Sequence, residues 1–205
     1  MRIHMKTSER GVGMVEFALF LTLLVPLLLG TFVFGFKLIR NIEMIQITRD
    51  LAHMYVRGVN FRNAGPQQNA QTMAAEYALT STGSSLVVLS SIRLVTQADC
   101  LAANGLILGL LPCTNLNKLV FIEQLTLGNP SAGASAFGTP PLEGDKTVSV
   151  YNLANTASAQ ATGFSTVMSL NSGEVAHVVE MINLTPELNI PGLSGSTQVY
   201  ARSIF

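Results

Sequence analysis

A run of 20 residues without a charged side chain, Phe17 to Phe36, constrains this sequence more than any other feature. As an α-helix the run would be about 30 Å long, which matches the hydrocarbon core of a bilayer. A secretory signal peptide has a shorter apolar core followed by a small-residue cleavage site, whereas this run ends in Phe34-Gly35-Phe36-Lys37. The sequence therefore predicts one membrane-spanning helix that is not removed at its far end.

The composition indicates a single folded body attached to that helix. Only 12% of the residues are charged and the mean hydropathy is +0.41, which is apolar for a soluble domain but too polar for a protein with many spans. The 12 basic and 12 acidic residues cancel, which argues against a nucleic-acid-binding protein. Residues 1–62 carry a formal charge of +4 and the rest carry −4, so the basic part of the chain surrounds the apolar run.

Basic residues lie on both sides of the predicted span. Arg2, Lys6 and Arg10 precede it, and Lys37 and Arg40 follow it. By the positive-inside rule, the count favours a cytoplasmic N-terminus by a small margin.

The two cysteines, Cys100 and Cys113, give a second indication of compartment. A disulfide between them would close a loop of about 14 residues, stabilise the fold by about 3 kcal/mol and indicate an oxidising environment. The alternative is a pair of unbonded structural thiols. No second cysteine pair or nearby histidine supports a zinc site.

Glu16 is out of place, because it lies three residues into the apolar stretch that starts at Met14. A charge at the centre of a membrane helix costs about 2.5 to 3.5 kcal/mol, so such a residue is a functional candidate by default. Gly11 precedes it by five residues, at the end of a polar leader, and its conformational freedom suits an extended link open to a protease. The alternative is a plain anchor with Glu16 at the level of the lipid headgroups.

A glycine, four residues, then Glu and an aromatic residue at the start of a hydrophobic helix resembles the processing site of type IV pilin-like proteins, in particular the TadE-like pseudopilins of Tad (Flp) pili. The resemblance implies cleavage between Gly11 and Val12 by a prepilin peptidase, with Val12 as the new N-terminus, Glu16 as its fifth residue and Phe17 as its sixth. It covers residues 8–36 closely and residues 174–205 more loosely.

The resemblance also implies a role. The domain beyond the span is longer than the tail of the major Flp pilin, which favours a minor subunit that acts in assembly, priming or tip structure. The implied partners are a prepilin peptidase, other pilin and pseudopilin subunits, the inner-membrane assembly platform and membrane lipid. Glu16 would recruit a neighbouring subunit and set its axial register by pairing with that subunit's new α-amino group.

The implied location is the bacterial inner membrane, with one span, the N-terminus inside, and the C-terminal domain in the periplasm or in an extracellular pilus. A different reading of the same residues is an uncleaved, membrane-anchored adhesion domain that contacts a ligand through the loop Gly128–Asp145, which is rich in Gly and Pro and is expected to be flexible and exposed.

The expected organisation is a leader at 1–11, a transmembrane helix at 12–36 kinked at Pro26, an amphipathic stalk helix at 37–60 and a domain at 61–205. Helical patterns come first and strand patterns afterwards, so the predicted class is α+β, pilin-like, with an antiparallel sheet packed on the long helix. A second helix is expected at Gln67–Leu79, and Asn152–Ser172 is expected to be a short helix or a loop. The expected strands are Leu86–Val95, Leu119–Leu127, Thr147–Tyr151, Glu174–Leu184 and Thr197–Phe205.

No set of residues in the sequence predicts catalysis, a cofactor or a metal site. The three histidines, His4, His53 and His177, are scattered without metal-ligand spacing. Glu174, Glu180 and Glu187 are expected to be solvated charges at strand edges. The sequence therefore favours a structural protein over an enzyme.

Overall fold

A computed structural model describes residues 10–104, 113–184 and 198–205. The chain forms two units, residues 1–40 and residues 41–205. The first contains the N-terminal part of helix α1, which runs from Arg10 to Val56 and contributes its last four turns to the second unit. Helix α1 ends four residues before the expected limit, where Gly58 adopts a positive φ of 82° that favours glycine.

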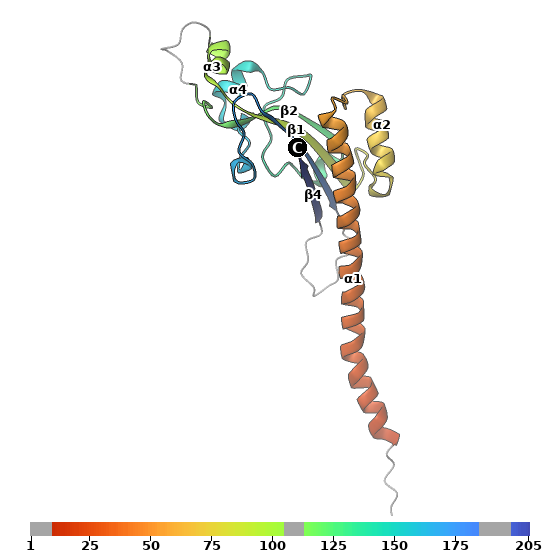
Figure 1. Ribbon diagram of the computed structural model, residues 1–205. Coiled ribbons are helices and arrows are strands. Elements are labelled where there is room, and N and C mark those ends of the chain that lie inside the picture. The colour runs from red at the N-terminus through yellow and green to blue at the C-terminus, as the bar shows by residue number, and fades with distance from the viewer. Residues whose placement is uncertain (1–9, 105–112, 185–197) are drawn as a thin grey trace, which may run out of the picture. The chain divides into compact units, whose positions relative to one another are not determined.

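Four antiparallel strands form the centre of the second unit (Figure 1). They are β1 (Ser85–Leu94), β2 (Leu119–Gly128), β3 (Val175–Leu184) and β4 (Gln198–Ile204), arranged in the order β2-β1-β3-β4. Strands β1, β2 and β3 have Val, Ile, Leu or Phe at consecutive positions, so they present apolar side chains to both faces of the sheet. Both faces must therefore be covered.

One face is covered by the last turns of α1, by α2 (Ala64–Met73) and by the 3-10 turn η1 (Ala75–Tyr77). Helix α1 buries one stripe, at positions three and four residues apart, against alternate residues of the strands. The core of this face includes Met44, Leu51, Ala52, Phe61, Tyr77, Val87, Leu89, Val179, Met181 and Ala201.

The opposite face is covered by short elements and loops. They are α3 (Gln97–Asn104), η2 (Pro130–Ala132), α4 (Val150–Asn155), η3 (Ala157–Ala159) and η4 (Phe164–Thr166). The core beneath them includes Leu86, Val88, Ile92, Val120, Phe121, Phe137, Leu153, Phe164, Val178 and Ile182. The predicted α+β class with an antiparallel sheet packed on the long helix is confirmed.

Two of the expected elements differ from the structure. Thr147–Tyr151 is not a strand, because Thr147 makes only an isolated bridge to Glu123 and Val150 already begins α4. The side chain of Ser149 accepts a hydrogen bond from the backbone N–H of Asn152 and so caps that helix. The second helix is shorter than expected, since α2 ends at Met73 and the chain continues into η1.

Helix α3 was not expected, although its start has a sequence signature. Thr96 and Asp99 form a reciprocal cap, in which the backbone N–H of Thr96 donates to Asp99 over 2.8 Å and that of Asp99 to the Thr96 hydroxyl over 3.4 Å. Burial raises the pKa of Asp99, but the hydrogen bonds from Thr96 and the charge of Arg93 at 2.6 Å outweigh it, so the pKa lies below its ordinary value.

The loop Gly128–Asp145 is not a flexible exposed segment. Ala132, Phe137 and Pro140 are buried, and the Phe137 ring packs edge-on against Phe164 with centroids 5.0 Å apart. The Arg202 guanidinium lies 5.0 Å from the centroid of the Phe137 ring on the sheet side. The segment therefore lies over the sheet as part of the core.

Glu180 holds this loop in place, so the expectation of a solvated charge is wrong for this residue. Its side chain is 0% exposed. It accepts hydrogen bonds from the Ser135 hydroxyl, from the Ala136 backbone N–H at 2.9 Å and from the Tyr200 hydroxyl at 2.6 Å. The expectation of an exposed charge holds for Glu174, and Glu187 lies outside the described residues.

Replacing Glu180 by alanine should lower the free energy of unfolding by about 3 kcal/mol, because it leaves three donors without their acceptor beside the core. Urea unfolding of the full chain in detergent measures the change. Glu143→Ala removes an exposed carboxylate from the same loop and is the matched control. A loss for Glu180→Ala no larger than that of the control would contradict the assigned role.

Candidate functional site

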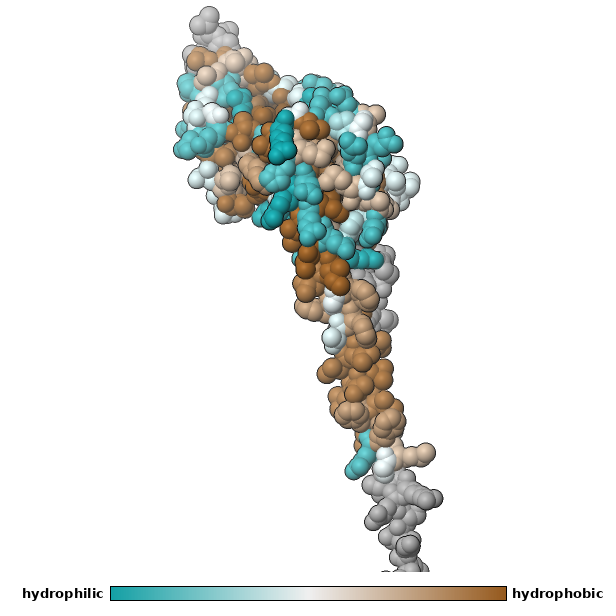
Figure 2. Space-filling view, turned by 45° about the vertical axis from the view of Figure 1, so that its right-hand side comes forward, coloured by the Kyte–Doolittle hydropathy of each residue, from teal (hydrophilic) through white to brown (hydrophobic). Residues whose placement is uncertain are grey.

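The N-terminal part of α1 is apolar on all sides. The stretch from Gly13 to Val56 is long and apolar enough to cross a membrane, and its most apolar 18 residues are 0% buried. Figure 2 shows this helix surface as almost continuous brown. The large apolar side chains between Met14 and Phe36 other than Val33 are exposed and point in every direction, as a lipid-facing helix requires.

The polar side chains of this helix segment are satisfied within it, with one exception. The Thr22 hydroxyl donates to the carbonyl of Leu19 at 2.7 Å, and the Thr31 hydroxyl donates to that of Leu27 at 2.8 Å. Such bonds remove the cost of placing hydroxyls in hydrocarbon. Glu16 is the exception, because it is exposed and has no hydrogen-bond or ion-pair partner among the described residues.

The predicted processing site lies in the first two turns of α1. Arg10 is the first helical residue, so Gly11 and Val12 have helical backbone rather than the extended link that was expected. Glycine lowers helix stability by about 1 kcal/mol relative to alanine but does not prevent helix formation, and no proline interrupts this region. Val12 and Glu16 are four residues apart, about 6 Å along the axis and near the same face.

Pro26 lies inside α1 in the middle of the apolar run. It lacks the N–H that would bond to the carbonyl one turn earlier, so the kink there remains a prediction from sequence.

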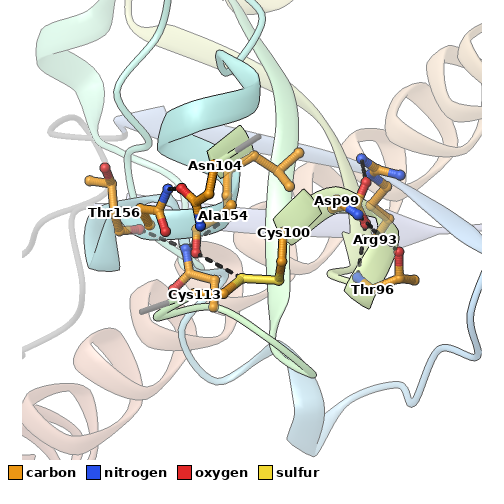
Figure 3. The surroundings of a disulfide bond; sticks show 11 residues. Arg93, Thr96, Asp99, Cys100, Asn104, Cys113, Ala154 and Thr156 are labelled. Carbon is orange, nitrogen blue, oxygen red and sulfur yellow. Dashed lines mark hydrogen bonds and ion pairs between the residues drawn. A yellow bond between two sulfur atoms is a disulfide. The ribbon is translucent and has the colours of Figure 1, made fainter. Parts of the chain in front are cut away.

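Cys100 and Cys113 form a disulfide, with Cα atoms 5.7 Å apart (Figure 3). The bond joins α3 to the turn before β2. Asn155 at the end of α4 donates to the Asn104 side chain over 2.9 Å, and the Cys113 sulfur lies 3.6 Å from the carbonyl oxygen of Ala154. The disulfide therefore ties α3 to the turn before β2, and the hydrogen bond between Asn155 and Asn104 joins α3 to α4.

A polar cluster lies between the end of α1 and the sheet, and it was missed from sequence. Ser91, Glu123 and His177 are direct neighbours on the three strands β1, β2 and β3. The Ser91 hydroxyl is 3.0 Å from His177 Nδ1, 3.2 Å from Glu123 Oε1 and 2.8 Å from the Tyr55 hydroxyl. Tyr55 also donates to Glu123, and the Arg62 guanidinium bonds the other carboxylate oxygen at 2.7 Å.

The environment sets the protonation of this cluster. Burial raises the pKa of Tyr55, and the hydrogen bond to Glu123 raises it further, so the phenol remains a donor. Burial lowers the pKa of His177, and the negative charge of Glu123 offsets part of this decrease. The Tyr55 ring meets the His177 imidazole edge-on at 4.9 Å between centroids.

The cluster resembles a catalytic set in composition but not in arrangement. Ser91 is 1% exposed and its hydroxyl is already within hydrogen-bond distance of three side chains, so no substrate atom can approach it. Among the described residues, no three acidic, histidine or cysteine side chains come together in a way that could hold a metal ion. The hydrogen bonds of the cluster join α1 to three strands of the sheet and so stabilise the fold.

Residues 11–53 match a family model described as TadE-like protein. No curated protein and no solved structure matches the chain. The matched segment contains Gly11, Val12, Glu16 and Phe17, the apolar run, and most of the helix that packs on the sheet. The resemblance inferred from the sequence is confirmed over this segment. With the one helix among the described residues that is long and apolar enough to cross a membrane, it indicates a membrane-anchored, single-pass protein.

The stability of the sheet domain should fall as the pH drops below about 6.5, the ordinary pKa of histidine. His177 has a lowered pKa in the folded state, so the unfolded chain binds more protons in this range and unfolding becomes more favourable. Unfolding midpoints of the full chain between pH 8 and pH 5 measure the effect. His177→Gln should flatten this slope, while His53→Gln, the matched control on α1, should keep it. An unchanged slope in His177→Gln would contradict the assignment.

Proposed function

We propose that this chain, TadE-like over residues 11–53, is a minor pseudopilin of a Tad-type pilus. It is inserted as a precursor, cleaved by a prepilin peptidase after Gly11 and used in pilus assembly, priming or tip structure. The observation that carries the proposal is Glu16, an exposed carboxylate that has no partner among the described residues and lies in the apolar part of α1.

An isolated carboxylate in hydrocarbon is unfavourable, and a cation supplied by another molecule removes that cost. Cleavage between Gly11 and Val12 creates an α-amino group with an ordinary pKa of about 7.7 to 8.0, which is largely protonated at neutral pH. Two parallel copies displaced by four residues, about 6 Å, bring Glu16 of one level with the amino group of Val12 of the other. Glu16 therefore favours association and selects one axial displacement.

The position of the cleavage point supports this pairing. Val12 and Glu16 lie at i and i+4 on one helix, so the amino group and the carboxylate project from nearby parts of the same face. A peptidase must unwind the first turn of α1 to reach the bond after Gly11, and the glycines at 11 and 13 lower the cost of that unwinding.

The disulfide supports the proposed orientation. Disulfides persist in oxidising compartments, so the domain that carries Cys100–Cys113 belongs outside the cytoplasm. With one span, the N-terminal leader then lies in the cytoplasm of the bacterium and the sheet domain in the periplasm or on the pilus. The small excess of basic residues before the span agrees with this topology.

The size of the sheet domain favours a minor role over a bulk fibre subunit. Residues 41–205 form a compact unit with its own core on both faces of the sheet. The proposed partners are the prepilin peptidase, the other pilin and pseudopilin subunits, the assembly platform of the inner membrane and its lipid.

Replacing Gly11 by leucine should leave the precursor at full length when the peptidase is present, because a branched side chain blocks the bond before Val12. Electrophoresis and N-terminal sequencing of the membrane form measure the outcome. Gly13→Ala is the matched control, since a methyl group there meets nothing within 4 Å. Normal cleavage of the Gly11→Leu chain would count against a pilin-type processing site.

Replacing Glu16 by alanine should permit cleavage but abolish incorporation into pili, since the carboxylate acts after processing. Incorporation is measured by immunoblotting of sheared pili, and processing by N-terminal sequencing of the membrane fraction. Glu16→Asp keeps the charge and should retain part of the incorporation, whereas Glu16→Gln should not. Incorporation of Glu16→Ala at the wild-type level would remove Glu16 from the mechanism.

A further inference from the structure

A groove with an acidic rim runs between α1 and the segment α2–η1. Its volume is about 460 Å³, and its walls include the carboxylates Glu43, Asp50 and Glu76. Its apolar surface is provided by Ile47 and Met73, the latter 37% exposed. No lysine, arginine or histidine lines it.

The carboxylates of the groove keep their capacity to bind a cation. Glu43 accepts one hydrogen bond, from the Tyr77 hydroxyl at 2.7 Å. Asp50 and Glu76 are exposed and have no partner among the described residues. An occupant that fits this groove therefore carries a positive charge beside apolar side chains.

A surface of that kind lies on another side of the same helix. Ile42, Ile45, Arg49 and Val56 follow helical spacing and are all exposed, with Ile42 at 49% and Val56 at 45%. We call these four residues the α1 stripe. Arg49 has no partner among the described residues, and the stripe is otherwise apolar.

Groove and stripe lie on one chain but cannot meet within it. At 3.6 residues per turn, the α1 residues of the groove are roughly 120° around the helix from the stripe. Two different surfaces that complement each other produce a head-to-tail contact between neighbouring copies.

We propose that the groove lined by Glu43, Asp50 and Glu76 binds the α1 stripe of a second copy of this chain, with Arg49 as the central contact. This inference rests on the proposed function, because it names a contact between two neighbouring subunits of the same assembly. Arg49 supplies the positive charge that the three carboxylates of the groove attract.

Arg49 is neutralised in the groove of the sheet domain, and the apolar residues of the α1 stripe add to the apolar surface of Ile47 and Met73. A charged pair with apolar surroundings also disfavours other arrangements, because they leave these charges without partners.

Self-association of the full chain in membranes tests the proposal. Two differently tagged copies are produced together with the peptidase, solubilised in mild detergent, and the fraction that copurifies is measured. Arg49→Glu and Glu43→Arg should each reduce copurification at least tenfold, and the two changes in one chain should restore it. Glu43→Gln keeps an acceptor for Tyr77 but removes the charge, and should also weaken association.

Arg57→Glu is the matched control, since it reverses an exposed charge near the end of α1 outside both surfaces. Association of Arg49→Glu at the wild-type level would overturn the inference. The inference would also be overturned if the double variant, shown to be folded by its disulfide, did not recover association. A loss in Arg57→Glu equal to that in Arg49→Glu would overturn it too, as it would reveal a general charge effect.

The test separates this inference from the proposed function. Wild-type chains that remain uncleaved, or Glu16→Ala chains that associate normally, contradict the proposed function. Cleaved chains whose association depends on Glu16 but not on Arg49 or Glu43 contradict the groove contact alone.

Discussion

Helix α1 meets two environments along its length, and the rest of the structure depends on this constraint. Up to Ile39 its large apolar side chains are exposed, and from Met44 onward one stripe is fully buried against the sheet. A helix exposed to lipid needs apolar residues on every side, whereas a helix on a sheet needs them on one. The sequence changes from one pattern to the other within a few residues, and the sheet domain forms where the one-sided pattern begins.

Charges are scarce in this protein, and their positions follow from the same constraint. The carboxylates near the core have hydrogen-bond or ion-pair partners. Glu180 accepts from three donors, Asp99 is bonded by Arg93 and Thr96, and Glu123 is bonded by Tyr55, Ser91 and Arg62. Burial of a charge is tolerated only with such partners. Glu16 lies in the most apolar part of the chain and has no partner among the residues that the structure describes. The missing partner is the physical reason to expect a second molecule.

Much of the fold follows from local patterns. The alternation in Leu86–Val95 and Glu174–Leu184 identified β1 and β3 to within a residue at each end, because successive side chains of a strand point to opposite faces of the sheet. The same period would have identified Glu180, which is in phase with Ala176, Val178 and Ile182. Because Glu180 is charged, its side chain was expected to be solvated. The three donors that permit its burial come from residues 20 to 45 positions away, so no local pattern reveals them.

Other features depended on contacts that no local pattern contains. The loop Gly128–Asp145 has the composition of an exposed turn, yet Phe137 is buried because Phe164 and Arg202 enclose it. The cluster of Tyr55, Ser91, Glu123 and His177 forms through strand pairing and the packing of α1, so it was missed. Thr147–Tyr151 has strand propensity, but the cap at Ser149 starts a helix instead.

The central claim is that this protein is a processed pilin-like subunit whose mature chain begins at Val12. The most direct measurement is the intact mass of the wild-type protein isolated from membranes of cells that contain the prepilin peptidase. The account predicts a single disulfide-bonded species that lacks the mass of residues 1–11. A species that retains those residues would contradict it and would indicate an uncleaved membrane anchor.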